Sequence, residues 1–306
     1  MRSGESRPYV ALALTLLAAC FVGGCYFDLS LFGDPDTPDT VIVPEDVINA
    51  IDGERMKAIV HEITSELYAG RKTGSSGEAK ARKYIVQHFI SAGLLPGKRN
   101  GYEETYTVGG ENTANVVGYL PGIDSSPVRD EIVVVGGHHD HVGSGHPGAN
   151  DNASGTSMVI ELAYAVGLLR GALKRTAVFV TFSGEEEGCL GANFFVGNDT
   201  EFPIKNTVLY INLDMVGLGK RDDSYLMTYR QTYETEVQLL LNPLLSDCTW
   251  DEDVFANLGV RTLGKWNSAD DSCFHSACDK ADRLDYDGMA GRAKDVLQVI
   301  WNYLQE

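Results

Sequence analysis

The sequence predicts an α/β fold, a three-layer αβα sandwich around a mixed, mainly parallel sheet. Continuous apolar runs, typical of strands covered on both faces, alternate along the chain with longer segments whose apolar residues recur at helical spacing. Strands that alternate with helices in this way are typical of a parallel sheet with helices on its two faces. Of the 306 residues, 43% are hydrophobic, which is ample for a large buried core.

The folded part begins with two predicted helices, at 47–67 and 76–92, because apolar residues recur there every three or four positions. Segments at 102–108 and 114–120 predict two strands, and the continuous apolar run at 132–137 predicts a strand buried on both faces. The later elements follow the same patterns: a helix at 155–169, strands at 176–182 and 207–213 with a helix between them, a helix at 232–245, a short strand at 260–263 and a closing helix at 286–304.

The first 25 residues predict a lipoprotein-type signal peptide. Arg2 and Arg7 precede an apolar run over residues 9–19, which has the length of a signal-peptide core. Small residues precede both Cys20 and Cys25, as in the lipobox of bacterial lipoproteins, where cleavage exposes a cysteine for lipid attachment. We therefore expect lipid attachment at one of these two cysteines and an exported protein of the bacterial cell envelope. A simple secretory signal or an uncleaved anchor is the alternative.

Residues 26–44 predict a disordered acidic tether, because they are rich in Pro and Asp with little to bury. No internal repeat or second linker follows, so residues 45–306 are expected to form a single domain. The formal net charge of −18 argues against nucleic acid as a partner, since phosphates attract basic surfaces. The same charge disfavours adhesion to anionic lipid, so we expect membrane contact only through the N-terminal anchor.

Residues suited to metal binding gather where three successive buried strands end. The strand at 132–137 runs into a Gly-rich segment that contains four His residues, the next two strands run into Glu185–Glu187 and Asp214, and a fourth loop carries His275. The carboxyl ends of parallel strands border the crevice where ligands bind. Imidazoles and carboxylates together suit zinc, with cobalt or manganese possible on ligand type alone. Crowded acids also repel each other unless cations lie between them, so the sequence predicts a metal site.

These segments resemble the family of double-zinc aminopeptidases that includes bacterial leucyl aminopeptidase and, more distantly, glutamate carboxypeptidase, the transferrin receptor and glutaminyl cyclase. The resemblance covers nearly the whole folded part, from Gly70-Arg71 to the last helix. It depends on specific motifs in the family's order: His-x-Asp at 138–140, Gly-x-x-Asp-x-x-Ser-Gly at 148–155, and Glu-Glu at 185–186.

The resemblance implies two Zn²⁺ ions per chain and a role for each matching residue. His138 and Asp214 would hold one ion, Glu186 and His275 would hold the other, and Asp151 would bridge the two.

The resemblance also implies two catalytic roles. Asp140 would orient the imidazole of the first ligand from behind. Glu185 would be the general base, which takes a proton from a water between the metals and passes it to the leaving amine.

Spacing alone leaves other assignments open. His139 and His141 could form a ligand pair in place of His138, and only the family register favours His138. Glu187 could likewise replace either acid of the Glu185–Glu186 pair. Several further acids are expected to be loop acids or to cap and orient the last helix: Asp270, Asp271, Asp279, Asp282 and Asp285.

One segment departs from the family pattern. Relatives place a Ser-Asp-His-x-x-Phe segment, then a Gly-Ile-Pro turn and a strand, before the last ligand. Here 269–274 would be that segment, with Asp271 in the position of the motif's His, and it runs straight into His275. We therefore expect that the intervening piece is lost and that the pocket wall is open or rebuilt by 253–266.

Cysteine usage fits an exported chain, because four Cys residues remain after Cys20 and Cys25. Our hypothesis is that Cys273 and Cys278 form a disulfide that clamps the His275 loop. No Cys is expected to be a nucleophile, since a Cys/His pair would leave the acid cluster unexplained.

The sequence as a whole predicts a zinc-dependent aminopeptidase that acts on peptide substrates. Within the fold, a glutaminyl cyclase would need only one zinc, and a carboxypeptidase would need basic residues near the metals, for which Arg261 and Lys265 are candidates. A binding module without catalysis would be expected to have lost ligands, whereas this chain keeps all five and the base.

Overall fold

The computed structural model describes residues 42–197, 201–219, 224–229, 248–267 and 271–306. These residues belong to one compact unit, Asp39–Glu306. The expectations for the signal peptide, for Cys20 and Cys25, for most of the tether, for Asp270 and for a helix at 232–245 lie outside the described residues, as does the side chain of Lys265. Within the described part, no helix is both long and apolar enough to span a bilayer.

The described strands form one mixed sheet in the order β1-β3-β5-β4-β6-β8-β7, with β2 paired to β3. Their bounds are β1 (Leu95–Pro96), β2 (Glu103–Val108), β3 (Glu111–Leu120), β4 (Ile132–His138), β5 (Thr176–Phe182), β6 (Thr207–Leu213), β7 (Ser224–Tyr229) and β8 (Thr262–Asn267). The four central strands β5, β4, β6 and β8 are parallel, whereas the pairs at both edges are antiparallel. The predicted fold class is therefore confirmed.

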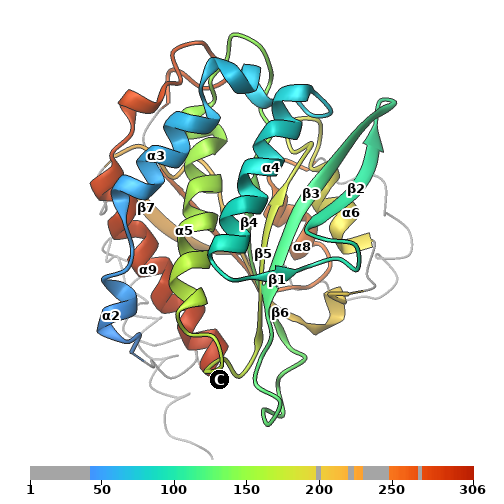
Figure 1. Cartoon of the computed structure of the whole chain (residues 1–306), viewed down its shortest axis with the longest axis vertical. Coiled ribbons are helices and arrows are strands. Elements are labelled where there is room, and N and C mark those ends of the chain that lie inside the picture. Colours follow the sequence, from blue (N-terminus) through green and yellow to red (C-terminus); the bar gives the residue numbers. More distant parts are fainter. Residues whose placement is uncertain (1–41, 198–200, 220–223, 230–247, 268–270) are drawn as a thin grey trace, which may run out of the picture. The chain divides into compact units, whose positions relative to one another are not determined.

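Helices cover both faces of the sheet, as Figure 1 shows. Their bounds are α2 (Glu45–Ile48), α3 (Gly53–Ile63), α4 (Ser76–Ser91), α5 (Gly155–Gly167), α6 (Leu190–Gly197), α8 (Asp251–Ala256) and α9 (Tyr286–Gln305). α3, α4, α5 and α9 pack together over one face, and α6 and α8 pack together over the other. Short 3-10 turns lie at Glu66–Arg71, Ile204–Asn206 and Ala281–Arg283.

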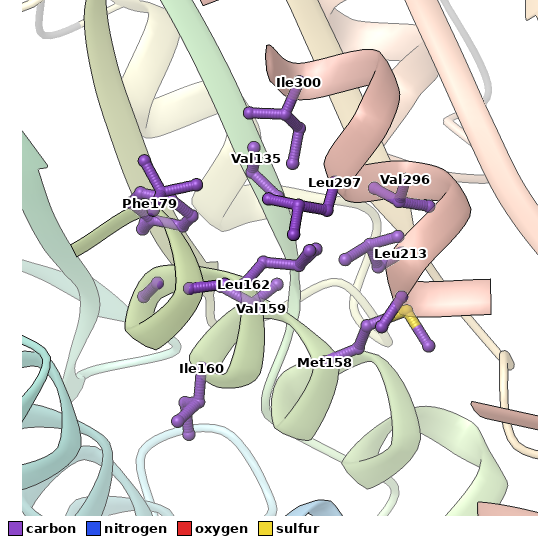
Figure 2. Packing of buried hydrophobic residues seen from close by; sticks show 14 of the residues in the cluster. Val135, Met158, Val159, Ile160, Leu162, Phe179, Leu213, Val296, Leu297 and Ile300 are labelled. Carbon is purple, nitrogen blue, oxygen red and sulfur yellow. The ribbon is translucent and has the colours of Figure 1, made fainter. Parts of the chain in front are cut away.

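Alternation along the buried strands supplies the two cores of this sandwich. In β4, Val133 and Val135 face the larger helical layer, whereas Ile132 and Val134 face α6 and α8. Successive side chains of a strand point to opposite faces, so a continuous apolar run fills both layers at once. Figure 2 shows the larger core, where side chains of α5 and α9 meet those of the central strands.

Polar caps fix where three helices begin. Asp52 accepts the N–H groups of Glu54 and Arg55 at the start of α3, and Ser75 and Asp285 cap α4 and α9 in the same way. The capping by Asp285 was expected. The single helix predicted at 47–67 is wrong, because the chain leaves the helical conformation after α2 and Asp52 starts a new helix.

Candidate metal centre

The predicted ligands lie together at the carboxyl ends of the central parallel strands. His138 is the last residue of β4, Asp214 directly follows β6, and Glu186 lies in the turn after β5. Asp151 precedes α5, and His275 lies in the loop before α9. Neighbouring parallel strands end at one edge of the sheet, so five residues from distant parts of the sequence share one site.

A first cluster consists of His138, Asp151 and Asp214, all of them buried. The Nε2 atom of His138 lies 3.3 Å from Oδ1 of Asp151 and 3.4 Å from Oδ1 of Asp214. Burial disfavours a charged imidazole, but the carboxylates of Asp214 and Glu185 outweigh it and raise the pKa of His138 well above its ordinary value. A field that attracts a proton so strongly also attracts a metal cation.

A second cluster consists of His141, Asp151, Glu186 and His275. The Nε2 atom of His275 lies 2.8 Å from Oε2 of Glu186 and 3.1 Å from Oδ2 of Asp151. Asp151 therefore belongs to both clusters, with one carboxylate oxygen toward each. The structure brings all five predicted ligands together in the predicted two sets, and adds His141 to the second.

The chemistry of this donor set fits bound cations. Two of its carboxylate oxygens are buried and have no hydrogen-bond partner among the described residues: Oδ2 of Asp151 and Oδ1 of Asp214. Such orphaned polar atoms are rare in folded proteins unless an ion or water satisfies them. Imidazoles and carboxylates gathered around two points suit two zinc ions.

Glu185 lies beside the first cluster, with its Oε2 atom 3.9 Å from Nε2 of His138. Burial and the carboxylates of Asp251, Asp214 and Asp140 raise the pKa of Glu185 to about 10, although His138 lowers it. Divalent cations reverse this effect, because they are the largest local charges in such a site and favour the carboxylate form. Cations bound by the two clusters would therefore lower the proton affinity of Glu185 and keep it a carboxylate.

Asp140 supports the first cluster from behind. Its Oδ1 atom lies 3.5 Å from Nδ1 of His138, and Oγ1 of Thr73 donates a 2.9 Å hydrogen bond to its Oδ2. Burial acts to raise the pKa of Asp140, but the adjacent imidazole lowers it below its ordinary value. This contact corresponds to the orienting role that the resemblance implies for Asp140.

Two of the alternatives that spacing left open are disfavoured by the geometry. Both ring nitrogens of His139 face away from the metal clusters, toward Thr181 and Glu78 at 3.1 and 3.0 Å. Glu187 is exposed and belongs to neither cluster. His141 differs, because its imidazole points into the second cluster.

Sequence reasoning missed two residues that hold the site in place. The guanidinium of Arg71 is fully buried and donates hydrogen bonds to carbonyl groups of the ligand-bearing loop, including those of His139 and Gly148. Asp279 was expected to orient the last helix, but its carboxylate accepts the backbone N–H groups of Asn150 and Asp151 at 2.9 to 3.0 Å. Only tertiary structure reveals these contacts, because each joins segments distant in sequence.

The expectation of a lost segment before His275 is wrong. α8 begins with Asp251 and carries Phe255 four residues later, Gly259 makes a turn with φ of 79°, and β8 follows and pairs with β6. An acid, a Phe, a Gly turn and a strand therefore occur in the family's order, twenty residues earlier than 269–274. Asp271 instead binds Arg283 and Asn150.

Two disulfides border the site. Cys273–Cys278 closes a short loop around His275, as hypothesised, and Cys189–Cys248 joins the start of α6 to the chain before α8. The clusters open into a cleft of about 620 Å³. Its apolar wall includes Met215, Trp250 and Phe274.

The sequence model of peptidase family M28 matches residues 115–300, which is more than half of the chain. Leupeptin-inactivating enzyme 1 of Streptomyces exfoliatus is 27% identical over 264 residues, which cover 76% of this chain and 56% of that protein. Aminopeptidase YwaD of Bacillus subtilis is 37% identical over 100 residues, which cover 32% of this chain and 21% of that protein. The chain thus spans about half the length, or less, of these relatives.

Solved structures share the fold. The aminopeptidase from Aneurinibacillus sp. strain AM-1 superposes with a TM-score of 0.66 at 17% identity, covering 84% of this chain and 95% of that chain. The zinc aminopeptidase BSAP from Bacillus subtilis superposes with a TM-score of 0.67 at 15% identity. The match covers 84% of this chain and 96% of that chain. Glutaminyl cyclase from Fimbriiglobus ruber superposes with a TM-score of 0.65 at 15% identity. The match covers 87% of this chain and 98% of that chain.

Proposed function

This chain belongs to peptidase family M28, and from that premise we propose that it is a zinc-dependent aminopeptidase with two Zn²⁺ ions per chain. One observation carries the proposal: two ligand clusters share Asp151, and Glu185 lies beside them in the lining of a cleft. His138 and Asp214 would hold one ion, and Glu186 and His275 the other.

The bound zinc ions would supply a water of lowered pKa and an electrophile for the peptide carbonyl. Glu185 supplies the proton transfer. Its carboxylate accepts a proton from the attacking water and later donates it to the nitrogen of the leaving amine, so one group acts as base and then as acid. Asp140 keeps the imidazole of His138 in place during both steps.

The cleft favours the amino end of a peptide over its carboxyl end. Five acids line it, and none of the described residues that line it is Lys or Arg. Arg261, one candidate for binding a substrate carboxylate, donates a hydrogen bond to the hydroxyl of Tyr303 instead. A cationic N-terminus suits this environment better than a carboxylate does, which disfavours a carboxypeptidase.

The other two rivals lack a supporting observation. A glutaminyl cyclase would need one ion, whereas both clusters keep complete donor sets here. A binding module without catalysis would have no need of Glu185 beside them.

The test is hydrolysis by the purified, zinc-loaded chain of one peptide offered with a free and with an acetylated N-terminus, followed by mass spectrometry. We expect loss of N-terminal residues from the free peptide only. Glu185→Gln should lower this activity by roughly 10³-fold or more while retaining zinc, which excludes a contaminating peptidase. Trimming from the carboxyl end, or equal trimming of both peptides, would contradict the proposal.

We also propose that the chain is exported and anchored in the bacterial cell envelope by a lipid on Cys20 or Cys25. The pattern of the first 25 residues supports this proposal. The test is metabolic labelling with a palmitate analogue in cells that produce Cys20→Ser and Cys25→Ser variants. One variant should lose the label, and retention of the label by both single variants and by the double variant would contradict it.

A further inference from the structure

His141 lies among the ligands of the second cluster, yet the resemblance gives it no role. It follows β4 by three residues, and its backbone N–H binds the carbonyl of Arg71. Its ring packs on Gly148 so closely that a Cβ there would lie 2.5 Å from the ring, and the residue is 1% exposed. The imidazole is therefore held rigidly in a position that the chain's fold provides.

The contacts of Glu186 divide between two imidazoles. Its Oε2 atom lies 2.8 Å from Nε2 of His275, whereas its Oε1 atom lies 2.8 Å from Nδ1 of His141. The same Nδ1 atom is 3.8 Å from Oδ2 of Asp151, too far for a hydrogen bond. The two imidazoles thus contact different oxygens of the Glu186 carboxylate.

We propose that His141 is a positioning residue, whose Nδ1–H donates a hydrogen bond to Oε1 of Glu186 and leaves Oε2 to bind the second metal ion. This inference rests on the proposed function. A carboxylate oxygen only accepts, so the proton at this contact must lie on Nδ1. A buried carboxylate oxygen without a donor is costly, and partners of this kind orient the ligating carboxylate and raise metal affinity.

The surroundings of the other ring nitrogen favour this role over direct coordination. The Nε2 atom of His141 is buried and has no hydrogen-bond partner among the described residues. A ligating His usually donates its second N–H to an acceptor. If His141 bound the metal through Nδ1, its proton would be on Nε2, and this buried N–H would have no acceptor among the described residues. If Nδ1–H donates to Glu186, Nε2 carries only a lone pair.

The experiment uses Co²⁺ as the probe and the full chain with His138→Ala, so that the visible absorption comes from the second cluster alone. His141→Ala removes the hydrogen bond. His141→Asn keeps an N–H donor near the position of Nδ1 but provides a poor metal ligand. His146→Ala, in the same loop but outside both clusters, is the matched control. Co²⁺ affinity is measured by competition with a chelator, and the absorption spectrum is recorded for each variant.

We expect His141→Ala to weaken Co²⁺ binding by about 10- to 100-fold. His141→Asn should restore affinity to within about threefold of the parent, with the parent's Co²⁺ spectrum, and His146→Ala should change neither. If His141→Asn loses as much affinity as alanine and changes the spectrum, His141 is a ligand and the proposal is wrong. Unchanged affinity in His141→Ala also overturns it.

These readouts need no substrate, so they separate this proposal from the proposed function. Absence of peptide cleavage together with the expected Co²⁺ results would overturn the substrate class alone. Failure of the otherwise unaltered chain to bind Co²⁺ would overturn both. If His141→Ala does not fold, His141→Asn decides by its affinity and spectrum.

Discussion

The two ligand clusters are built in different ways. The first takes His138 and Asp214 from the ends of adjacent parallel strands, and their side chains are 1% and 5% exposed. The second takes Glu186 and His275 from loops, and the side chain of His275 is 39% exposed with a backbone φ of 51°. The sheet itself fixes the first cluster, whereas local contacts must fix the second.

The first cluster is supported by buried polar contacts, whereas the second is supported by a disulfide and ring stacking. Behind His138 stand a buried carboxylate, Asp140, and the hydroxyl of Thr73. His275 is held by a disulfide around its own loop and by stacking on Phe274, whose ring centroid is 3.8 Å away. We therefore expect the first ion to bind to a preformed site and the second to depend on the loop.

The largest expected effect comes from the residue that the clusters share. Asp151→Asn should leave neither ion bound at full affinity, because it removes a charged ligand from both sets. kcat/KM should fall by roughly 10⁴-fold or more, as when a whole catalytic unit is disabled. Metal content per chain checks this. Asp214→Asn and His275→Ala should each lose one ion only, and loss of only one ion in Asp151→Asn would contradict the sharing of Asp151 by both clusters.

The support behind the first cluster should matter next. Asp140→Asn removes the charge that orients His138, so metal affinity of the first site should fall by about 10- to 100-fold. Chelator competition measures it, and Asp282→Asn, an exposed acid, serves as control. Equal weakening of both sites would show that the clusters are not independent.

The two disulfides should affect different properties of the protein. Cys273→Ser with Cys278→Ser should weaken only the second site, by about tenfold, since the loop must then be ordered on binding. Cys189→Ser with Cys248→Ser opens a link between residues 59 apart and should mainly lower the free energy of unfolding, by about 4 kcal/mol. Denaturant unfolding and metal titration of both variants distinguish these outcomes, and the reverse pattern would refute the assignment.

The smallest expected effect is on the pH dependence of stability, and it comes from His88, which belongs to neither cluster. Burial and the charge of Arg55 lower the pKa of His88, which contacts Tyr164 in the helical layer. The unfolded chain therefore binds this proton more readily than the folded one. The stability that His88 contributes is complete above the unfolded pKa of about 6.5 and is lost as pH falls through the folded value.

His88→Gln should accordingly flatten the decline of stability below pH 6.5, equally in metal-free and metal-loaded protein. Chemical denaturation at several pH values measures this. A flattening seen only with metal bound would mean that His88 senses the clusters.

Periodicity and motif order predicted the central architecture and the residues that gather at the site. β5 and β6 have the predicted bounds, because continuous apolar runs identify strands buried on both faces. The edge strands β1 and β7 were missed; β1 has only two residues, Leu95 and Pro96, too few for a period to show. The break before α3 was missed because the apolar spacing continues through Asp52.

The support of the site could not be predicted, for a physical reason. Arg71, His141 and Asp279 act through contacts with residues at least 45 positions away, which no local pattern encodes. The misplaced segment before His275 has a related cause. Two acid-rich stretches each carry a Phe, and only the pairing of β8 with β6 shows which one precedes the turn.

The Cys273–Cys278 disulfide around His275 makes completion of the second cluster depend on the redox environment in which the chain folds. A newly made chain with reduced thiols carries this ligand on an open loop, so the second donor set is completed by oxidation as well as by folding. If the chain is exported as proposed, the second donor set would be completed in the oxidising compartment that the chain enters.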